Sequence, residues 1–469
     1  MDGSHLLSML SKTVCSKASE EKLVKLNGLN RTWIILAACW FFMTGLLFGC
    51  GSAAQEETDS TVEYEESGES GMEEGGEASN TGSSSSALAA VESTGNAADY
   101  DGLEITIVVP KDAVTFTEEA AASFQEAYEV FAGVTILVES EEDAEADLLI
   151  FTQEQLEQMV LSGELDPVPS YYMQGLIREQ DAGAIEAASV DDTIYAWPLA
   201  IDSGYFLYYD ASVITDPSSL ETILAECEAT GRTFYMEINS GWYQTAFFFG
   251  TGCTLIYEVD ADGSFVSADM DYASEAGVTA LREILETAAS DAFRNGSAAG
   301  DTENMAAIVG GQWDELLVQE LLGETYACAP LPSFIGADGE TYQLSGFAGY
   351  ELLGVIPQED AHMSQVCHAF ASWLTGGEMQ SLRFQSEGDT PTNLSVQESD
   401  LVQADAAQAA LIEQAGRCVI QRQYPGDYWT MAASLGDDIV LRSLTSEASD
   451  EDLLEALQTF QDQCLSYTE

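Results

Sequence analysis

Basic residues are scarce in this sequence. It contains 14 Lys and Arg against 81 Asp and Glu, which gives a net charge of −67 at pH 7. From Cys50 onward, Lys111 is the one lysine, and the other basic side chains are arginines. A surface this acidic repels phosphate backbones and anionic lipid head groups. We therefore expect no nucleic-acid partner, and any attachment to a membrane must have another origin.

Histidine is rarer still, with three residues in the chain. Catalysis that depends on His as a general base is poorly supported by this count, and the G-x-S-x-G motif is absent. No C-x-x-C pair is present to suggest a zinc ribbon. The segment 260–263, Asp-Ala-Asp-Gly, is too short for a calcium loop and predicts a turn between two strands. We expect a protein that is not an enzyme, with no cofactor and no metal site.

Six cysteines follow Cys50, and their spacing does not choose among the pairings that six residues allow. Several of them lie in apolar or helical patterns, where free buried thiols are common. An oxidising compartment would permit disulfides, so both states remain open at this point. The six are Cys227, Cys253, Cys328, Cys367, Cys418 and Cys464.

The N-terminal region contains an apolar run from Trp33 to Phe48 that follows several basic residues and ends at Gly49-Cys50. This layout is typical of a secretory signal, and the run is short for a membrane span of about 20 residues. The stretch Leu47-Phe48-Gly49-Cys50 resembles the lipobox of bacterial lipoproteins. That resemblance implies a signal peptide over 1–49, a lipid on Cys50 and an extracytoplasmic protein anchored to the cell membrane. A plain transmembrane anchor that starts near Trp33 is the alternative.

Residues 50–100 are acidic and rich in Ser and Gly, with a run of four serines at 83–86. Such a segment buries too little apolar surface to fold, and like charges extend it. We predict a disordered tether over 50–100.

Strand and helix patterns alternate from residue 101 onward. Residues 103–109, 134–138 and 147–151 predict strands, and the segments after the first and third predict helices. This order indicates parallel βαβ units in an α/β fold, and the length suits two lobes. Near the C-terminus the periodicity predicts helices over 401–415, 428–444 and 450–465.

Several of these segments resemble the maltose-binding proteins of extracellular solute-binding protein family 1. The passages are Asp147 to Glu154 with Leu161 to Val168, Tyr195 to Ala200 with the strand to Asp210, Met305 to Trp313 with Ala329 to Pro332, Gly346 to Pro357, and Phe370 to Gly377. The resemblance implies a two-lobed, periplasmic-binding-protein-like fold of type II, whose lobes are joined by crossover hinge segments. Lobe 1 would comprise 101–200 and 350–399, and lobe 2 would comprise 204–345 and 400–469.

The same resemblance implies a function. The protein would capture an oligosaccharide such as a maltodextrin between its lobes and deliver it to the permease subunits of an ABC transporter, and we expect it to act as a monomer. Aromatic side chains would stack on sugar faces, while carboxylates, amides and basic groups would bind hydroxyls. The ligand-binding residues implied are Lys111, Asp112, Glu154, Asp202, Asn239, Trp242, Tyr243, Trp313, Tyr428 and Trp429.

Departures from the family pattern keep other ligands open. Gln155 and Ala433 stand where the maltose binder has basic residues, so a different oligosaccharide fits equally well. Another small solute is the main alternative, including a ferric ion held by tandem tyrosines such as 171–172 or 208–209. A glycan-acting surface enzyme with paired carboxylates and an adhesion lipoprotein are the remaining ones.

Overall fold

The computed structural model describes residues 84–141 and 144–468. The predicted signal peptide, Cys50 and most of the predicted tether lie outside these residues. Among the described helices, none is long and apolar enough to cross a membrane.

Lobe 1 is built on a mixed sheet that contains the three strands predicted first. Strands β1 (Glu104–Val108), β2 (Thr135–Glu139) and β3 (Leu148–Thr152) are parallel, as the βαβ pattern predicted. Strand β16 (Phe347–Val355) is antiparallel to β3 and also pairs with β6 (Ala196–Ser203). The short strand β17 (Val419–Ile420) pairs in parallel with the N-terminal end of β16. It adds residues 419–420, which we assigned to lobe 2, to the sheet of lobe 1.

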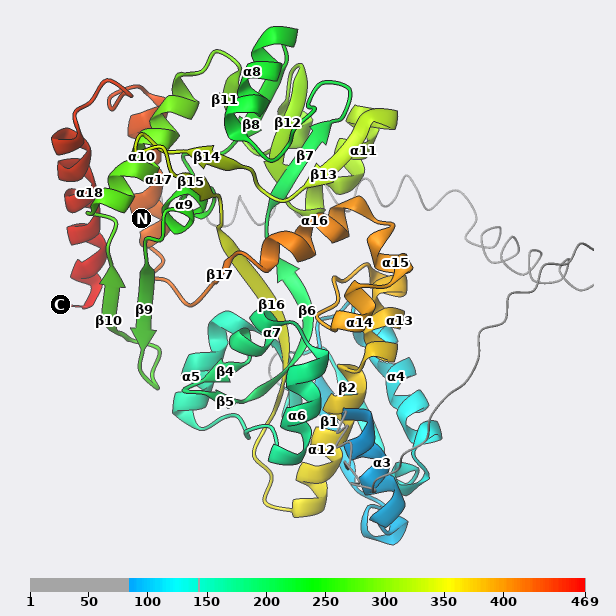
Figure 1. The fold of residues 1–469 in the computed structure, drawn as a ribbon. Coiled ribbons are helices and arrows are strands. Elements are labelled where there is room, and N and C mark those ends of the chain that lie inside the picture. Colours follow the sequence, from blue (N-terminus) through cyan, green and yellow to red (C-terminus); the bar gives the residue numbers. More distant parts are fainter. Residues whose placement is uncertain (1–83, 142–143, 469) are drawn as a thin grey trace, which may run out of the picture. The chain divides into compact units, whose positions relative to one another are not determined.

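Lobe 2 has a second mixed sheet, in the order β11-β8-β12-β7-β13. Strand β8 is parallel to both of its neighbours, and β7 is antiparallel to both of its own. Figure 1 shows the two sheets in separate lobes, with helices packed around each. The strands are β7 (Phe206–Asp210), β8 (Thr233–Met236), β11 (Phe293–Asn295), β12 (Met305–Gly310) and β13 (Tyr326–Ala329).

Helices and short hairpins complete both lobes. The predicted helix over 401–415 is two helices, because Asp405 accepts hydrogen bonds from the backbone of residues 407 and 408 and starts a new helix there. The predicted turn at 260–263 is confirmed between β9 and β10.

In lobe 1 and the crossovers the elements are α4 (Val114–Ala127), α5 (Leu156–Ser162), α6 (Ser170–Glu179), α7 (Ala182–Ala187), β4 (Ser189–Val190), β5 (Thr193–Ile194), α12 (Ala361–Leu374), α13 (Gly377–Glu387), α14 (Leu394–Gln397), α15 (Asp400–Gln403) and α16 (Ala406–Ala415). In lobe 2 they are α8 (Leu220–Thr230), α9 (Gly241–Gly250), β9 (Leu255–Val259), β10 (Phe265–Met270), α10 (Glu275–Ala289), α11 (Glu315–Leu322), β14 (Ser333–Ile335), β15 (Thr341–Gln343), α17 (Tyr428–Val440) and α18 (Asp450–Leu465).

The chain crosses between the sheets at several points that lie close together. It leaves lobe 1 between β6 and β7 and returns at Gly346, just before β16. Gly346 has a φ of +110°, and a Cβ there would lie 2.4 Å from the hydroxyl oxygen of Tyr205. Glycine is therefore required at this crossing, because both the backbone conformation and the contact with the first crossover exclude a side chain.

The prediction of a disordered tether over residues 50–100 is wrong for its C-terminal part. Residues 84–94 form helix α3, which precedes a short 3₁₀ turn at 97–99. Leu88 and Val91, one helical turn apart, are buried, and they belong to the apolar core of lobe 1 together with Tyr100. The small residues around them allow close packing, so this segment buries enough apolar surface to fold although it is part of the acidic stretch.

All six cysteines that follow Cys50 are free thiols. Burial raises the pKa of each; for Cys227 and Cys253, for example, the pKa rises to about 11. The alternative left open by their spacing is resolved in favour of free thiols, of which four are buried and two, Cys328 and Cys418, are partly buried.

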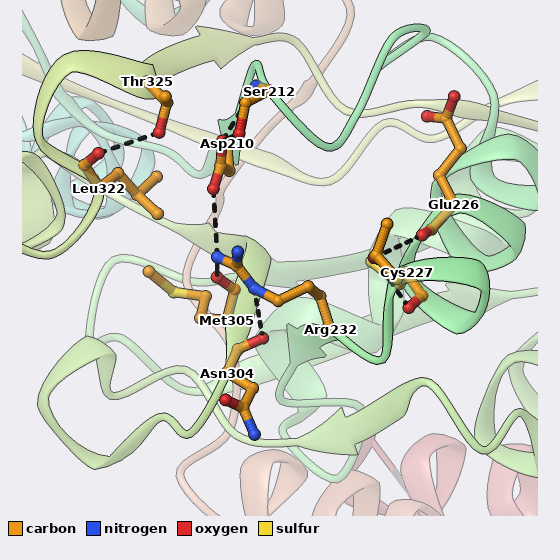
Figure 2. Close-up of polar contacts among 10 residues, drawn as sticks. Asp210, Ser212, Glu226, Cys227, Arg232, Asn304, Met305, Leu322 and Thr325 are labelled. Atoms are coloured by element: carbon orange, nitrogen blue, oxygen red, sulfur yellow. Dashed lines mark hydrogen bonds and ion pairs between the residues drawn. The ribbon is translucent and has the colours of Figure 1, made fainter.

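An ion pair closes one end of the lobe 2 sheet (Figure 2). Arg232, just before β8, reaches Asp210 at the end of β7, with 3.1 Å between Nη2 and Oδ2. The guanidinium also donates to the backbone carbonyls of Asn304 and Met305, where β12 begins. Burial acts to raise the pKa of Asp210, but hydrogen bonds from Ser212 and the charge of Arg232 hold it below its ordinary value.

We expect the change Asp210→Asn to destabilise the protein by about 1–2 kcal/mol at pH 7, because the charged hydrogen bonds to Arg232 are lost. Since the folded-state pKa of Asp210 is lowered, its contribution is present above the unfolded-state value of about 4 and is lost as the pH falls through the folded-state value. Urea unfolding at pH 7 and at pH 3 measures both.

Asp216→Asn is the matched control for this prediction. Asp216 also accepts hydrogen bonds from the residue two positions later, Ser218, but it is exposed and has no arginine partner. We expect a much smaller change in the free energy of unfolding. Equal losses in both variants would show that the ion pair with Arg232 contributes nothing.

Candidate functional site

A cavity of about 430 Å³ lies where the lobes meet. Most of its lining comes from lobe 1 and the crossover strands, and Gln312 from lobe 2 closes one side. Two of the predicted ligand-binding residues, Asp112 and Asp202, are part of this lining. The lining residues are Pro110, Asp112, Ala113, Ala200, Ile201, Asp202, Gln312, Glu351, Arg383, Glu387 and Asp389.

Arg383 organises the polar wall of this cavity. Its Nη2 lies 2.5 Å from Oε2 of Glu351, and its Nε lies 2.6 Å from Oδ2 of Asp389 and 3.3 Å from Oε2 of Glu387. Only 7% of the arginine side chain is exposed. Burial raises the pKa of Glu351 and of Glu387, while the charge of Arg383 acts in the opposite direction. One arginine thus holds three carboxylates in fixed orientations.

Asp202 lies outside this group of ion pairs. Burial raises its pKa, and the nearby charge of Asp389 raises it further. The charge of Asp202 in turn raises the pKa of Glu154, for which burial is the main cause. The electrostatic interaction between these two side chains connects the cavity with the turn that follows β3.

Aromatic side chains of lobe 2 form a group that includes the residue after Gln312 in the chain but does not itself line the cavity. The ring centroids of Trp242 and Trp313 are 5.8 Å apart, and Trp242 lies 4.6 Å from Tyr205 and 5.2 Å from Tyr243. Trp313 is 57% exposed. A Cβ at Gly311 would lie 2.2 Å from its ring, so the glycine leaves the space that the indole occupies.

Trp429 borders the same aromatic group. A Cβ at Gly241, next to Trp242, would lie 3.4 Å from a ring atom of Trp429. The Trp429 ring is half-buried, at the start of α17. The predicted residues Trp242, Trp313 and Trp429 thus belong to one aromatic group of lobe 2.

Glu154 and Trp242 are linked through a residue that the sequence did not suggest. Gln421 donates from Nε2 to a carboxylate oxygen of Glu154, and its Oε1 accepts a hydrogen bond of 2.9 Å from the indole nitrogen of Trp242. Glu154 lies in the short 3₁₀ turn η3 (Gln153–Gln155) after β3, as predicted.

Other predicted residues lie elsewhere. Tyr428 is fully buried against Tyr424 and Phe460 in the core of lobe 2, and Tyr243 is 5% exposed. The side-chain amide of Asn239 is used within lobe 2: its NH₂ donates to Asp437 and its oxygen accepts from Asn295. Lys111 is exposed beside Asp112 but is not part of the cavity lining.

The sequence did not suggest Glu351, Arg383, Gln312 or Gln421. Glu351 had a usable signal, since it is the one charged residue in the otherwise apolar run from Phe347 to Val355. Arg383 belongs to a helix far away in sequence, and Gln421 to a segment with no periodic pattern. Nothing local marks either as a cleft residue.

Among the described residues, no group of three His, Cys, Asp or Glu side chains is arranged to hold a metal ion. The tandem tyrosines considered for ferric ion do not both expose their side chains. Tyr171 is 55% exposed but Tyr172 is fully buried, and the fully buried Tyr208 donates its hydroxyl hydrogen to the carbonyl of Gly311. Neither pair presents two phenol oxygens to the cavity.

A larger cavity of about 610 Å³ lies on lobe 2, away from the crossovers. Helix α10, the turn after β14 and the start of α18 line it, and Arg282 there is hydrogen-bonded to Asp450. It belongs to one lobe and contains none of the predicted residues, so the cavity between the lobes is the better candidate for a ligand site.

Comparisons with known proteins identify the family and the fold. A family model described as bacterial extracellular solute-binding protein matches residues 135–410. No curated protein sequence matches the chain significantly.

Solved structures with the same fold cover most of the chain. A maltodextrin-binding protein from L. casei BL23, solved without ligand, has a TM-score of 0.65 at 19% identity, over 79% of this chain and 99% of that chain. The maltose-binding periplasmic protein of Listeria monocytogenes, in complex with maltose, has a TM-score of 0.60 at 16% identity, over 78% and 99%. An extracellular solute-binding protein of Staphylococcus aureus, in complex with maltose, has 0.62 at 13%, over 77% and 97%. This likeness establishes the two-lobed α/β fold.

The different burial of two aromatic residues predicts different effects on stability. Tyr428→Ala removes a fully buried ring, so we expect a loss of about 3–5 kcal/mol in the free energy of unfolding. Trp313→Ala removes a ring that is 57% exposed, and we expect a loss below about 1 kcal/mol. Urea unfolding measures both, and similar losses would place Trp313 in the core.

Proposed function

Because the chain belongs to the bacterial extracellular solute-binding proteins, we propose that its lobes capture an oligosaccharide of the maltodextrin kind in the cleft between them. The observation that supports this most is the exposed Trp313 ring, packed against Trp242 beside a polar cavity. An exposed aromatic face next to fixed carboxylates suits a sugar, which has apolar C–H faces and a rim of hydroxyls.

Each group has a definite role in this proposal. The Trp313 face, with Trp242 and Trp429 beside it, receives a sugar ring. Asp112 and Asp202, which form no ion pair with Arg383, accept hydrogen bonds from hydroxyls. Gln312 supplies an amide from lobe 2. Arg383 orients Glu351 and opposes the effect of burial on its pKa, and so it acts through that carboxylate.

The solved relatives support an oligosaccharide, since two of those described above contain maltose. Gln155 and Ala433 stand where the maltose binder has basic residues, so the hydroxyl contacts here rely on carboxylates and amides. A maltodextrin of different length, or another neutral oligosaccharide, fits this set of side chains.

The charge of the cavity favours a second candidate, a small cationic solute. The lining contains five carboxylates and one arginine, and an amine would relieve the repulsion between the carboxylates. Titration of the protein with spermidine beside maltotetraose separates the two candidates, since a cation site responds to salt and a neutral sugar site does not.

The family and the lipobox-like stretch support a proposal for the cellular role. We propose that a lipid on Cys50 anchors the protein outside the cytoplasmic membrane, and that the monomeric protein delivers its sugar to the permease subunits of an ABC transporter. The acidic stretch after Cys50 would hold the lobes away from the membrane, because its charges repel anionic lipid.

Calorimetry with maltotetraose on the full-length protein in mild detergent tests the ligand. A central stacking tryptophan typically contributes about 2 kcal/mol or more, so we expect Trp313→Ala to weaken binding by at least about thirtyfold. Leu316→Ala is the control, because Leu316 is 83% exposed three residues later and does not line the cavity. Unchanged binding by the Trp313 variant would reject the proposed stacking site.

The anchor is tested separately. If Cys50 carries the lipid, Cys50→Ser should leave the protein unlabelled by a fatty-acid probe and release it from the membrane fraction or leave it unprocessed. Cys227→Ser, which changes a buried thiol, should keep the label. A processed wild-type protein without label would reject the lipoprotein assignment.

A further inference from the structure

Gln421 lies at the point where the last crossover leaves lobe 1, directly after β17. Its backbone is held to the lobe 1 sheet on two sides. Its N–H donates to the carbonyl of Ala348 in β16, and its carbonyl accepts a hydrogen bond of 2.9 Å from the side chain of Gln153. The Gln153 amide also accepts from the backbone N–H of Tyr350 in β16, at 2.6 Å. The backbone of Gln421 is therefore a fixed part of the lobe 1 sheet edge.

From this position the Gln421 side chain points at two groups from different lobes. Its amide NH₂ donates to Glu154, which follows β3 of lobe 1, and its amide oxygen accepts from the indole of Trp242, which begins α9 of lobe 2. Both halves of the amide are used, and each in the only sense that the partner allows: an ionised carboxylate accepts and an indole N–H donates.

Trp242 is held from the other side by the first crossover. The hydroxyl of Tyr205 donates to the Trp242 carbonyl at 2.9 Å, and the Tyr205 ring packs against the indole. Thr245 donates to the same carbonyl. Tyr205 thus holds the backbone carbonyl of Trp242 and packs against its ring, while Gln421 accepts from the indole N–H. The indole is therefore restricted in position and in orientation.

Glu154 is restricted by the same amide. One carboxylate oxygen accepts from Gln421, which leaves the second oxygen for another donor. Glu154 is half-buried, and burial raises its pKa while the hydrogen bond from Gln421 lowers it. The amide therefore helps to keep Glu154 in the ionised form that accepts hydroxyl hydrogen bonds.

We infer that Gln421 is a positioning residue of the ligand site: its amide bridges Glu154 of lobe 1 and Trp242 of lobe 2, and it fixes the carboxylate and the indole relative to one another. This inference rests on the proposed function, because it concerns how the sugar-binding groups are oriented. Glutamine is suited to the position, since leucine offers neither contact, lysine cannot accept from the indole, and ionised glutamate cannot donate to Glu154.

The change Gln421→Glu keeps the size of the side chain and the acceptor for Trp242, but it places two carboxylates against each other. At pH 7 we expect maltotetraose affinity to fall about tenfold or more, because the Glu154 carboxylate is repelled from its position. Like charges raise the pKa of such a pair, so a shared proton should restore the bridge and much of the affinity as the pH falls from 7 to 5. Wild-type affinity should change less over this range.

Combining this change with Glu154→Gln tests whether the two residues act as a unit. In the Glu154→Gln background the carboxylate introduced at position 421 can accept from the amide introduced at position 154, so adding Gln421→Glu should cost little further affinity. Gln423→Glu is the control, because it places the same charge on the same segment outside the bridge. Equal losses from Gln421→Glu in both backgrounds, or a loss that does not depend on pH, would overturn the proposal.

A measurement without ligand separates this inference from the proposed function. The indole N–H resonance of Trp242, identified by its absence in Trp242→Phe, should move upfield in Gln421→Leu when its acceptor is removed. An unmoved resonance would overturn the bridge whatever the ligand is. If wild-type protein does not bind maltotetraose, the proposed sugar is rejected, and the bridge stands or falls on this resonance.

Discussion

The antiparallel pairing of β16 with both β3 and β6 is the constraint on which the rest of the molecule depends. Strand β16 brings the chain back from lobe 2 into the lobe 1 sheet, and the other crossing segments pair with its N-terminal end, through Ser203 and β17. The required glycine at 346 lets the Tyr205 hydroxyl approach this meeting point. Because the crossovers converge there, Asp202 and Glu351 come from distant parts of the sequence to one cavity, and Gln421 is hydrogen-bonded to β16 on a third crossing segment.

Shortage of positive charge shapes how this protein uses its arginines. Arg383 lies among three carboxylates at the cavity, Arg232 joins three strands of the lobe 2 sheet, and Arg282 links α10 to the start of α18. Arg383 neutralises acidic groups that would otherwise repel one another, and Arg232 and Arg282 each pair with one carboxylate. Glutamine side chains make many of the other buried hydrogen bonds. The buried, hydrogen-bonded glutamines include Gln153, Gln180, Gln380, Gln408 and Gln414. An amide donates and accepts without adding charge, which suits an interior that already borders many carboxylates.

In the proposed function, the cleft combines two surfaces with different physical character. Lobe 2 supplies aromatic rings, of which Trp313 is the most exposed, and lobe 1 supplies carboxylates whose orientation is set by Arg383 and Gln421. Stacking on the rings is driven by apolar contact and desolvation, while the carboxylates provide directional hydrogen bonds. Gln421 touches both surfaces, so the orientation of the two is coupled through a single amide.

The sequence by itself determined the class of fold, because alternating strand and helix periods and the order of the family-like motifs depend on local patterns. It also marked Glu154, Asp112, Asp202, Trp242, Trp313 and Trp429 as candidates for the ligand site, because each follows or ends a recognisable strand or begins a helix. Tertiary structure alone decided that Tyr428 belongs to a core and that residues 84–100 fold onto lobe 1, since both depend on which surfaces are available for burial. It alone brought Arg383 to Glu351 and Gln421 to Trp242. These pairs are far apart in the chain, and their contact arises from the crossing of strands between two sheets, which no local pattern encodes.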